Sequence, residues 1–230
     1  LGITGFIALI VIVAIFGGSS KDSTPTNQEN NNVAPAPATN VIAKLEAEAR
    51  EIRKEVLRMI VSARAMHIAS SYSIVELLVY LYEDFLRVDP SFRPDRDRFI
   101  LSKGWGVSTL YTLLMRKGFF KRNLLDTYCK DGSALIGAAT RTIPGIEATT
   151  CSMGHGLPIG VGMALANRLR AISGRVVVLI SDGECDEGST WEAVLQAGHY
   201  KLDNLIAVVD YNKWQSFGRV EDILDLEPFR

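Results

Sequence analysis

The chain has 230 residues, of which 47% are hydrophobic, 22% charged and 8% aromatic. These values are typical of a globular chain with one or two domains, long enough to bury a core. A formal net charge of -1 argues against a protein that binds nucleic acid electrostatically. The cysteine spacing matches no zinc or redox motif, so reduced thiols are expected at Cys129, Cys151 and Cys185.

The first 18 residues differ from the rest of the chain. Residues 6–16 (FIALIVIVAIF) form an unbroken apolar run. As a helix, residues 1–18 would reach about 27 Å at ~1.5 Å per residue, slightly less than a bilayer core of ~30 Å. Neither a basic segment nor a clear cleavage site supports a secretory signal. We therefore expect an apolar leader, with a membrane anchor, a truncated leader and a misassigned start as the alternatives.

Residues 19–40 are predicted to be a flexible linker. The segment is dominated by Ser, Thr, Pro, Asn and Gln, so it has little apolar surface to bury. Beyond it, residues 41–230 carry equal numbers of basic and acidic residues and are expected to form the folded domain.

The first half of this domain is predicted to be mainly helical. Apolar residues at helical spacing predict a helix over 42–66. The sequence Ser73-Ile-Val-Glu76 is a capping box, which predicts a second helix to about Leu86. A short strand is expected over 98–101, and a helix over 107–117 is expected to end at Gly118.

Residues 131–153 are rich in Gly, Thr and Ser and are predicted to form a long irregular segment, which is often functional in a compact domain. A helix over 156–170 should follow. Two continuous apolar runs at 176–180 and 205–209 are expected to be strands buried on both faces.

A second capping box, Ser189-Thr-Trp-Glu192, lies between these strands and predicts a helix to about Tyr200. The order strand, helix, strand predicts a right-handed βαβ unit with parallel strands. The predicted fold class is therefore α/β, with a parallel sheet flanked by helices.

Polar residues follow each of these two strands directly. Asp182-Gly183 follows the first, and Asp210-Tyr211-Asn212 follows the second. Because neighbouring parallel strands end at one crevice, Asp182 and Asn212 are expected to face the same ligand. Their oxygens suit Mg²⁺ or Ca²⁺, and Gly183 lets an anion approach the backbone. A metal-bound phosphate or diphosphate fits this set; an ordinary acidic turn is the alternative on this pattern alone.

The segments SDGECDEGSTWEA and HYKLDNLIAVVDYNKWQSFG resemble the thiamine diphosphate motif of the transketolase family. In that motif an Asp and an Asn lie about thirty residues apart, as Asp182 and Asn212 do. Three further blocks resemble the family in the same order: MHIASSYSIVELL at 66–78, RDRFILSKG at 96–104 and PGIEATTCSMGHGLPIGVGMALA at 144–166. The resemblance implies that residues 41–230 have the fold of the diphosphate-binding (PP-type) domain.

The resemblance also implies which residues hold the cofactor. Asp182, Asn212 and the backbone carbonyl of Trp214 are expected to bind Mg²⁺ (or Ca²⁺), which would neutralise the diphosphate. The residues expected to contact thiamine diphosphate are Ser152, Met153, Gly154, Asp182, Gly183, Glu184, Asn212 and Trp105.

The implied reaction is the transfer of a two-carbon ketol unit from a ketose phosphate to an aldose through thiamine diphosphate. His67 matches a histidine on the substrate side that transfers protons, with a surface histidine at a helix end as the alternative. Glu187 matches a member of a carboxylate network between two active sites, and Glu192 is a further candidate for that network.

Several positions depart from the family pattern. Trp105 and Ala138 stand where the family usually has histidines, in Ser-Lys-Gly-His and Gly-His-Pro. Met66 and Ala69 replace the glycines of the early segment, and Ser181 replaces the first glycine of the metal motif. Because an indole cannot shuttle a proton at neutral pH, we expect weak use of phosphorylated pentoses or a different donor and acceptor.

A partner is also expected. In this family a second domain binds the pyrimidine ring of the cofactor, and no segment of this sequence resembles it. The chain stops before the last strand expected of the first domain. We therefore expect the N-terminal subunit of a split transketolase, C-terminally incomplete and nearly inactive alone, in a heterotetramer of two plus two with a C-terminal subunit. Sugar phosphates are the expected substrates.

Two other interpretations stay open. The chain could belong to another thiamine diphosphate enzyme, such as a 1-deoxyxylulose-5-phosphate synthase or a 2-oxo acid dehydrogenase subunit, or it could be a non-catalytic cofactor-binding or interaction subunit. Phosphosugar chemistry and unpaired cysteines favour the cytoplasm, with a membrane tether through residues 1–18 as an option.

Overall fold

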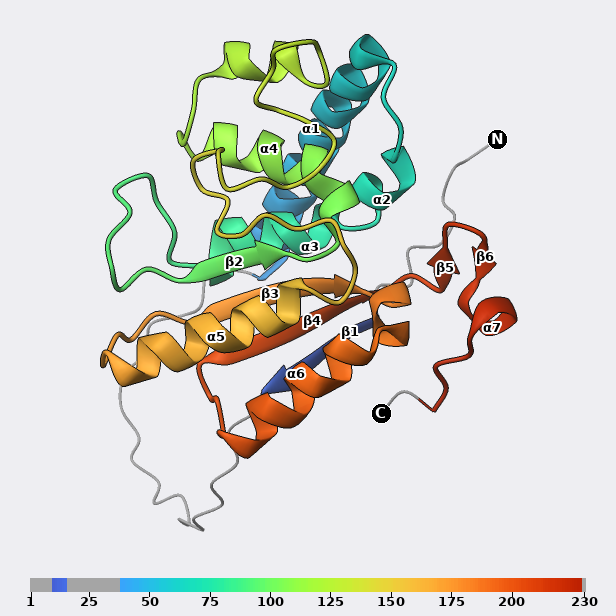
Figure 1. The fold of residues 1–230 in the computed structure, drawn as a ribbon. Helices are drawn as coiled ribbons and strands as arrows, with labels where there is room; N and C mark the ends of the chain where they lie inside the picture. Colours follow the sequence, from blue (N-terminus) through green and yellow to red (C-terminus); the bar gives the residue numbers. More distant parts are fainter. Residues whose placement is uncertain (1–9, 16–37, 229–230) are drawn as a thin grey trace.

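The computed structural model describes residues 10–15 and 38–228. A four-stranded sheet in the order β1-β4-β3-β2 lies at its centre, with helices on both faces (Figure 1). The sheet consists of β1 (Ile10–Ile15), β2 (Arg98–Leu101), β3 (Val176–Ser181) and β4 (Leu205–Tyr211), and a separate hairpin consists of β5 (Trp214–Gln215) and β6 (Gly218–Arg219).

The strands β2, β3 and β4 run parallel to one another. β3 and β4 are continuous apolar runs because helices cover both faces of the sheet. Alternate residues of β3 enter two separate cores: Val177 and Leu179 lie in one, and Val176, Val178 and Ile180 lie in the other. The predicted α/β class with a parallel sheet is confirmed.

Each face of the sheet has its own layer of helices. α1, α3 and α4 pack on one face, and α5 and α6 pack on the other (Figure 1). Helix α6 joins β3 to β4 and completes the predicted βαβ unit. The helices are α1 (Ala38–Ala63), α2 (Ile68–Tyr72), α3 (Val75–Tyr80), α4 (Val107–Arg116), α5 (Gly156–Leu169), α6 (Gly188–His199) and α7 (Val220–Ile223), and the shorter helical turns are η1 (Leu81–Phe85), η2 (Gly104–Gly106), η3 (Arg122–Thr127) and η4 (Gly183–Asp186).

Most of the elements predicted for residues 41–230 are confirmed. The predicted helices over 42–66, 107–117 and 156–170 correspond to α1, α4 and α5. α4 is followed by Gly118, whose φ of 83° is the left-handed conformation that favours glycine after a helix. No helix or strand lies between η3 and α5, which confirms the irregular segment.

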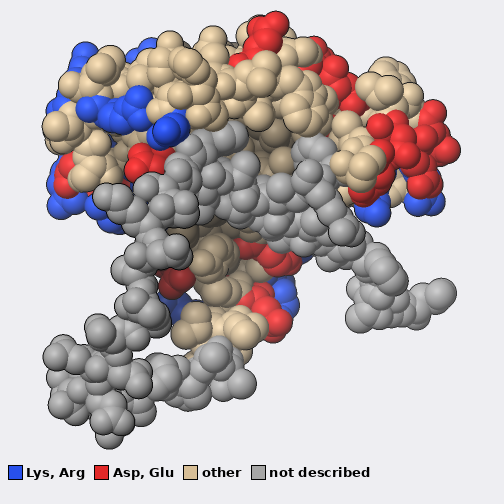
Figure 2. All heavy atoms as spheres, turned by 90° about the horizontal axis from the view of Figure 1, so that it is seen from below, with Lys and Arg blue, Asp and Glu red and all other residues tan. Residues whose placement is uncertain are grey.

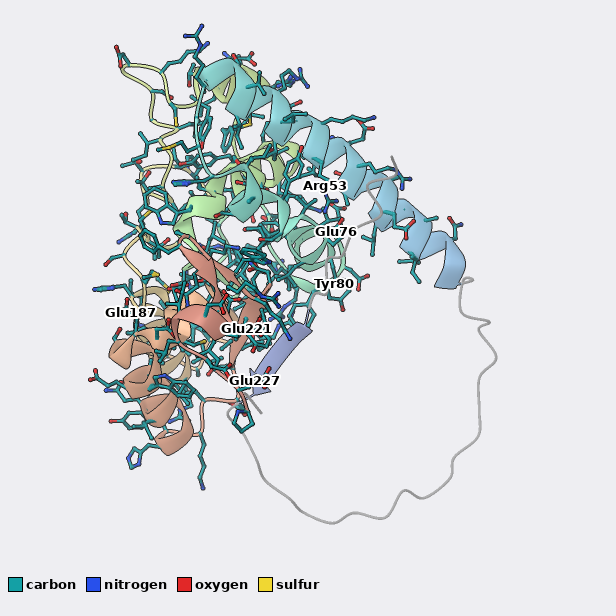
Figure 3. The ribbon with its side chains drawn as sticks, turned by 90° about the vertical axis from the view of Figure 1, so that its right-hand side faces the viewer. Arg53, Glu76, Tyr80, Glu187, Glu221 and Glu227 are labelled. Atoms are coloured by element: carbon teal, nitrogen blue, oxygen red, sulfur yellow. The ribbon has the colours of Figure 1, made fainter. Side chains whose placement is uncertain are left out.

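The first predicted capping box is wrong. Helix α3 begins at Val75, and its N-cap Ile74 makes no side-chain hydrogen bond. Ser73 Oγ instead donates to Asp210 Oδ2 at 2.8 Å, and Glu76 forms an ion pair with Arg53 of α1 (Figure 3). A local cap is only one of the partners open to a serine, and here partners from distant elements prevail.

The second predicted capping box is also wrong. Helix α6 begins at Gly188, with Glu187 at the N-cap position. Ser189 Oγ donates to the carbonyl of Gly154 at 2.8 Å, and Glu192 is exposed. The serine therefore ties the start of α6 to the irregular segment before α5.

The N-terminal apolar run contributes β1, an edge strand. β1 pairs with β4 in the antiparallel sense, with Val13 opposite Val208. The β-branched residues of this run suit a strand. The rest of the predicted leader, at 1–9 and 16–18, lies outside the described residues, as does most of the predicted linker. Helix α1 begins at Ala38, so it includes the last three residues of the predicted linker, 38–40. None of the described helices is long and apolar enough to cross a membrane.

Candidate functional site

The ends of β3 and β4 bring the predicted metal ligands into one place. Asp182, 1% exposed, follows β3 directly. Its Oδ2 accepts a hydrogen bond from the backbone N–H of Lys213 at 2.7 Å, and its Oδ1 accepts one from the N–H of Gly183 at 2.9 Å. The carboxylate of Asp182 is thus held against the turn that contains Asn212 and Trp214.

The amide of Asn212 has a defined orientation in this turn. Its Nδ2 donates to Asp210 Oδ2 at 3.0 Å, and its Oδ1 accepts from the N–H of Trp214 at 2.9 Å. Asp182, Asn212 and the Trp214 backbone therefore offer carboxylate, amide and carbonyl oxygens from adjacent positions. This is the ligand chemistry that Mg²⁺ and Ca²⁺ prefer.

The electrostatics of the site also suit a cation. Burial raises the pKa of the Asp182 carboxyl, while the two backbone hydrogen bonds oppose that shift. Asp210 is fully buried, and its Oδ1 has no hydrogen-bond partner within the described residues. Figure 2 shows further acidic side chains gathered at the end of the molecule that carries β5, β6 and α7. Lys103 pairs with Asp210, so the carboxylate of Asp182 is the charge that a divalent cation would offset, and the residues present fit a metal.

Gly154 allows the irregular segment to approach α6 closely. Its φ is 73°, and an added Cβ would lie 2.3 Å from Ser189 Oγ and 2.8 Å from Glu187 Cβ. No other residue type fits there without movement of α6. The preceding residues, Ser152 and Met153, are exposed and lie at the surface beside this contact.

Glu184 is a buried residue that links separate segments of the site through hydrogen bonds. It is 1% exposed, and burial raises the pKa of its carboxyl. Its Oε1 accepts from Ser102 Oγ at 2.5 Å and from the Gly154 N–H at 3.0 Å, and its Oε2 accepts from the Ser181 N–H at 3.0 Å. Both oxygens therefore bind protein donors from three elements, and Glu184 supports the loop that carries Ser152 and Met153.

His67 and Trp105, which belong to different sequence blocks, lie together. Their ring centroids are 4.3 Å apart at an interplanar angle of 54°. His67 has a left-handed φ of 71°, and burial lowers the pKa of its imidazole. The lowered pKa favours the neutral form of the imidazole.

The two acidic residues predicted to join a carboxylate network lie at the start of α6. Glu187 is half-buried, and Figure 3, which looks onto the side that carries β5, β6 and α7, places it at the left edge of the molecule. Glu192 is exposed one turn further along α6. Both side chains are accessible from outside the domain.

Three residues of the site were not predicted to be functional from the sequence. Lys103 forms an ion pair with Asp210 and donates to Ser73 Oγ at 2.8 Å. The side chains of Lys103 and Asp210 are 9% and 1% exposed. Their positions in the sequence could have identified them, because Lys103 follows β2 and Asp210 lies near the end of β4, at the same edge of the sheet as Asp182.

Comparisons with known proteins agree with this geometry. Residues 45–227 match the family model described as "Transketolase, thiamine diphosphate binding domain". The chain is 41% identical over 191 residues to one subunit of the apulose-4-phosphate transketolase of Phocaeicola vulgatus, covering 82% of this chain and 68% of that protein. It is 42% identical over 187 residues to the 6-deoxy-6-sulfo-D-fructose transketolase subunit SqwG of a Clostridium species, covering 80% and 68%.

Solved structures give the same result. The transketolase from Leishmania mexicana superposes with a TM-score of 0.77 at 26% identity, and the transketolase from Campylobacter jejuni with a TM-score of 0.75 at 26% identity. Each match covers 80% of this chain, which spans 30% of the length of either enzyme. The chain therefore belongs to the transketolase family, and residues 45–227 are its thiamine diphosphate-binding domain.

Proposed function

We propose that the chain is a catalytic subunit of a split transketolase that transfers a two-carbon ketol unit from a ketose phosphate to an aldose. The carrying observation is the contact between the buried Asp182 carboxylate and the turn of Asn212 and Trp214. Two similar proteins are named as subunits of transketolases, which supports a partner subunit here. We further propose that the partner supplies the pyrimidine-binding domain, in an assembly of two plus two.

In this proposal Asp182, Asn212 and the Trp214 carbonyl hold Mg²⁺ (or Ca²⁺), which binds the diphosphate. Gly183 lies beside the metal turn, and Ser152, Met153, Gly154 and Trp105 line the cofactor. Thiamine diphosphate, when bound, supplies the carbon nucleophile and stabilises the charge on the transferred unit.

The protein side chains orient the reactants and move protons. Burial lowers the pKa of His67 and so favours the neutral ring, which can accept a proton at a ring nitrogen from a substrate hydroxyl. The Trp105 indole beside it can only donate one hydrogen bond. Glu187 and Glu192 are accessible to a partner carboxylate network. The non-histidine residues at 105 and 138 support weak use of phosphorylated pentoses. Ala138 has no polar side-chain group, and its carbonyl already accepts a hydrogen bond from Tyr111 Oη at 3.0 Å.

Titration of the full chain with thiamine diphosphate tests the cofactor and metal sites. We expect binding with Mg²⁺ and none after chelation with EDTA. Replacing a metal ligand, as in Asp182→Ala or Asn212→Ala, should raise the Kd for thiamine diphosphate by at least about 100-fold. Asp203→Ala removes an exposed carboxylate at the opposite ends of the strands and should leave the Kd unchanged. Equal binding with EDTA would contradict the metal site.

Mixing the chain with a subunit that carries a pyrimidine-binding domain tests the reaction. Ketol transfer by the mixture, and almost none by the chain alone, would support a catalytic subunit. Cofactor binding without transfer in any mixture would favour the non-catalytic alternative, and a decarboxylated product would favour another thiamine diphosphate enzyme. Phosphosugar chemistry supports a cytoplasmic location, which cell fractionation would check; residues 1–18 remain our candidate tether.

A further inference from the structure

Asp210 is the centre of a buried cluster at the metal turn. Its Oδ2 accepts hydrogen bonds from Ser73 Oγ at 2.8 Å and Asn212 Nδ2 at 3.0 Å, and it forms the ion pair with Lys103. These groups come from the end of α2, the residues after β2 and the turn after β4. A fully buried carboxylate with three donors on one oxygen is tightly held.

This cluster determines which way the Asn212 amide faces. In the observed orientation Nδ2 meets a carboxylate oxygen and Oδ1 meets the Trp214 N–H. The reversed orientation would put Oδ1 against the Asp210 carboxylate and Nδ2 against the Trp214 N–H, so two attractive contacts would become repulsive. The hydrogen bond to Asp210 therefore keeps Asn212 Oδ1 pointing toward the backbone N–H of Trp214.

Lys103 compensates the negative charge of the buried Asp210 carboxylate. Without its ammonium group, Asp210 would be an uncompensated buried charge close to Asp182. Lys103 balances that charge but makes no hydrogen bond to the amide of Asn212 among the described contacts, so the charge and the hydrogen bond of Asp210 can be separated by mutation.

We propose that Asp210 is a positioning residue for the metal, acting by holding the Asn212 amide with its oxygen available to the cation. The inference rests on the proposed function, because it assumes that Asn212 is a metal ligand. It assigns to Asp210 a hydrogen-bonding role that its charge alone would not require.

Two double variants separate the hydrogen bond from the charge. K103M/D210N removes both charges but keeps an oxygen that can accept from Asn212 Nδ2. K103M/D210L removes the same charges and the acceptor. Mn²⁺ binding to the full chain in the presence of thiamine diphosphate is measured by electron paramagnetic resonance, and folding is followed by urea denaturation.

We expect K103M/D210N to keep the wild-type Mn²⁺ Kd within a few-fold and K103M/D210L to weaken it by about 10- to 100-fold. Adding Asn212→Asp to K103M/D210L should recover most of the affinity, because a carboxylate presents an oxygen in either orientation. If the leucine variant does not fold, K103M/D210A, which also lacks the acceptor but adds no bulk, replaces it.

Equal Mn²⁺ affinity in the asparagine and leucine variants would overturn the positioning role while leaving the proposed function intact. No Mn²⁺ binding by the wild-type chain would instead refute the proposed function and this inference together. Asp97→Asn serves as a control for a buried acid far from the site: it should lower stability and leave the Mn²⁺ Kd unchanged.

Discussion

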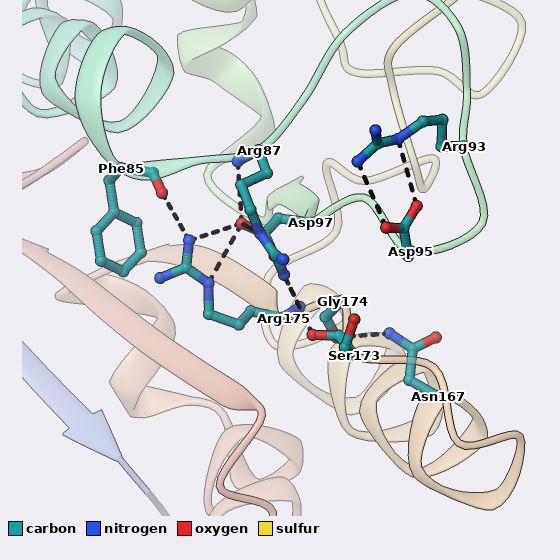
Figure 4. Close-up of polar contacts among 9 residues, drawn as sticks. All are labelled: Phe85, Arg87, Arg93, Asp95, Asp97, Asn167, Ser173, Gly174 and Arg175. Atoms are coloured by element: carbon teal, nitrogen blue, oxygen red, sulfur yellow. Dashed lines mark hydrogen bonds and ion pairs between the residues drawn. The ribbon is translucent and has the colours of Figure 1, made fainter.

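Individual buried carboxylates have different roles in this protein, and their partners reveal which. Asp182 accepts hydrogen bonds from the backbone N–H groups of Gly183 and Lys213. Glu184 links the end of β3 and the residue after β2 to the segment before α5, and Asp210 pairs with Lys103 and accepts from Asn212 Nδ2. Asp97 is also fully buried, and among the described residues its carboxylate bonds only to the side chains and backbone of Arg87 and Arg175 (Figure 4). Residue type alone does not separate these roles, because all four are acidic groups near strand ends.

Asp97 is expected to be a stability residue. It joins the segment after η1 to the residue before β3, and Asp97→Asn should lower the free energy of unfolding by about 2–3 kcal/mol, the value of hydrogen bonds to a charged group. Urea denaturation measures this. Asp95→Asn is the matched control, because Asp95 and its partner Arg93 are exposed and should contribute only ~0–1 kcal/mol.

The carboxylate of Asp97 should also make the stability of the protein depend on pH. Burial alone would raise the pKa of Asp97, but hydrogen bonds from Arg175 and Arg87 outweigh it and hold the pKa well below its ordinary value. The stabilisation is therefore complete above the unfolded pKa of about 3.9 and is lost as the pH falls below it. The difference in unfolding free energy between wild type and Asp97→Asn should stay constant above about pH 5 and shrink below about pH 4. A difference that grew on acidification would contradict the ion pair.

At the scale of elements, β3 and β4 were easier to predict than β1 or the helix starts. An apolar run between turn residues specifies β3 or β4 by itself, since helices cover both faces of the sheet. The serines of the two capping boxes could not be assigned locally. Ser73 bonds to Asp210, 137 residues away, and Ser189 bonds to Gly154, 35 residues away.

The pairing of β1 with β4 can be tested by mutation. Residues paired with β4 cannot at the same time lie in a bilayer, so pairing and tethering are alternatives for residues 10–15. Val13→Pro should weaken the edge pairing, because proline cannot donate a backbone hydrogen bond and its ring restricts the φ angle of a strand residue. We expect faster hydrogen exchange in β4, by about tenfold or more, and Val13→Thr as a control should match the wild type. Unchanged exchange in the proline variant would argue that β1 leaves β4 in solution.

At the scale of the whole molecule, the sheet makes the site by bringing three strand ends to one edge. Ser102 and Lys103 after β2, Asp182 after β3 and Asn212 after β4 are far apart in sequence and adjacent at this edge. Parallel pairing is the cause, because each parallel strand ends on the same side. Binding at this edge should therefore stabilise the entire domain.

Thermal unfolding measures that coupling. With thiamine diphosphate and Mg²⁺ both near 100 times the Kd, linkage predicts about 2.7 kcal/mol of stabilisation, or a Tm increase of roughly 5–10 °C for a domain of this size. Either ligand alone should shift the Tm little, because the metal and the diphosphate neutralise each other. Thiamine without its diphosphate is the control; an equal Tm shift with thiamine would show that the metal turn is not what binds the cofactor.

The sequence by itself determined the strands β3 and β4, the parallel βαβ unit and the family blocks that place Asp182 and Asn212 at one edge. These follow from apolar runs and from chain order, which are local properties. Only the tertiary structure decided that Glu184 is buried, that Asp210 pairs with Lys103 and accepts from Asn212, and that His67 contacts Trp105. Apart from the Asp210–Asn212 hydrogen bond, those contacts join residues from 30 to 107 positions apart, so no local pattern encodes them. Buried polar groups pair with the partners that the packed core brings within hydrogen-bond distance.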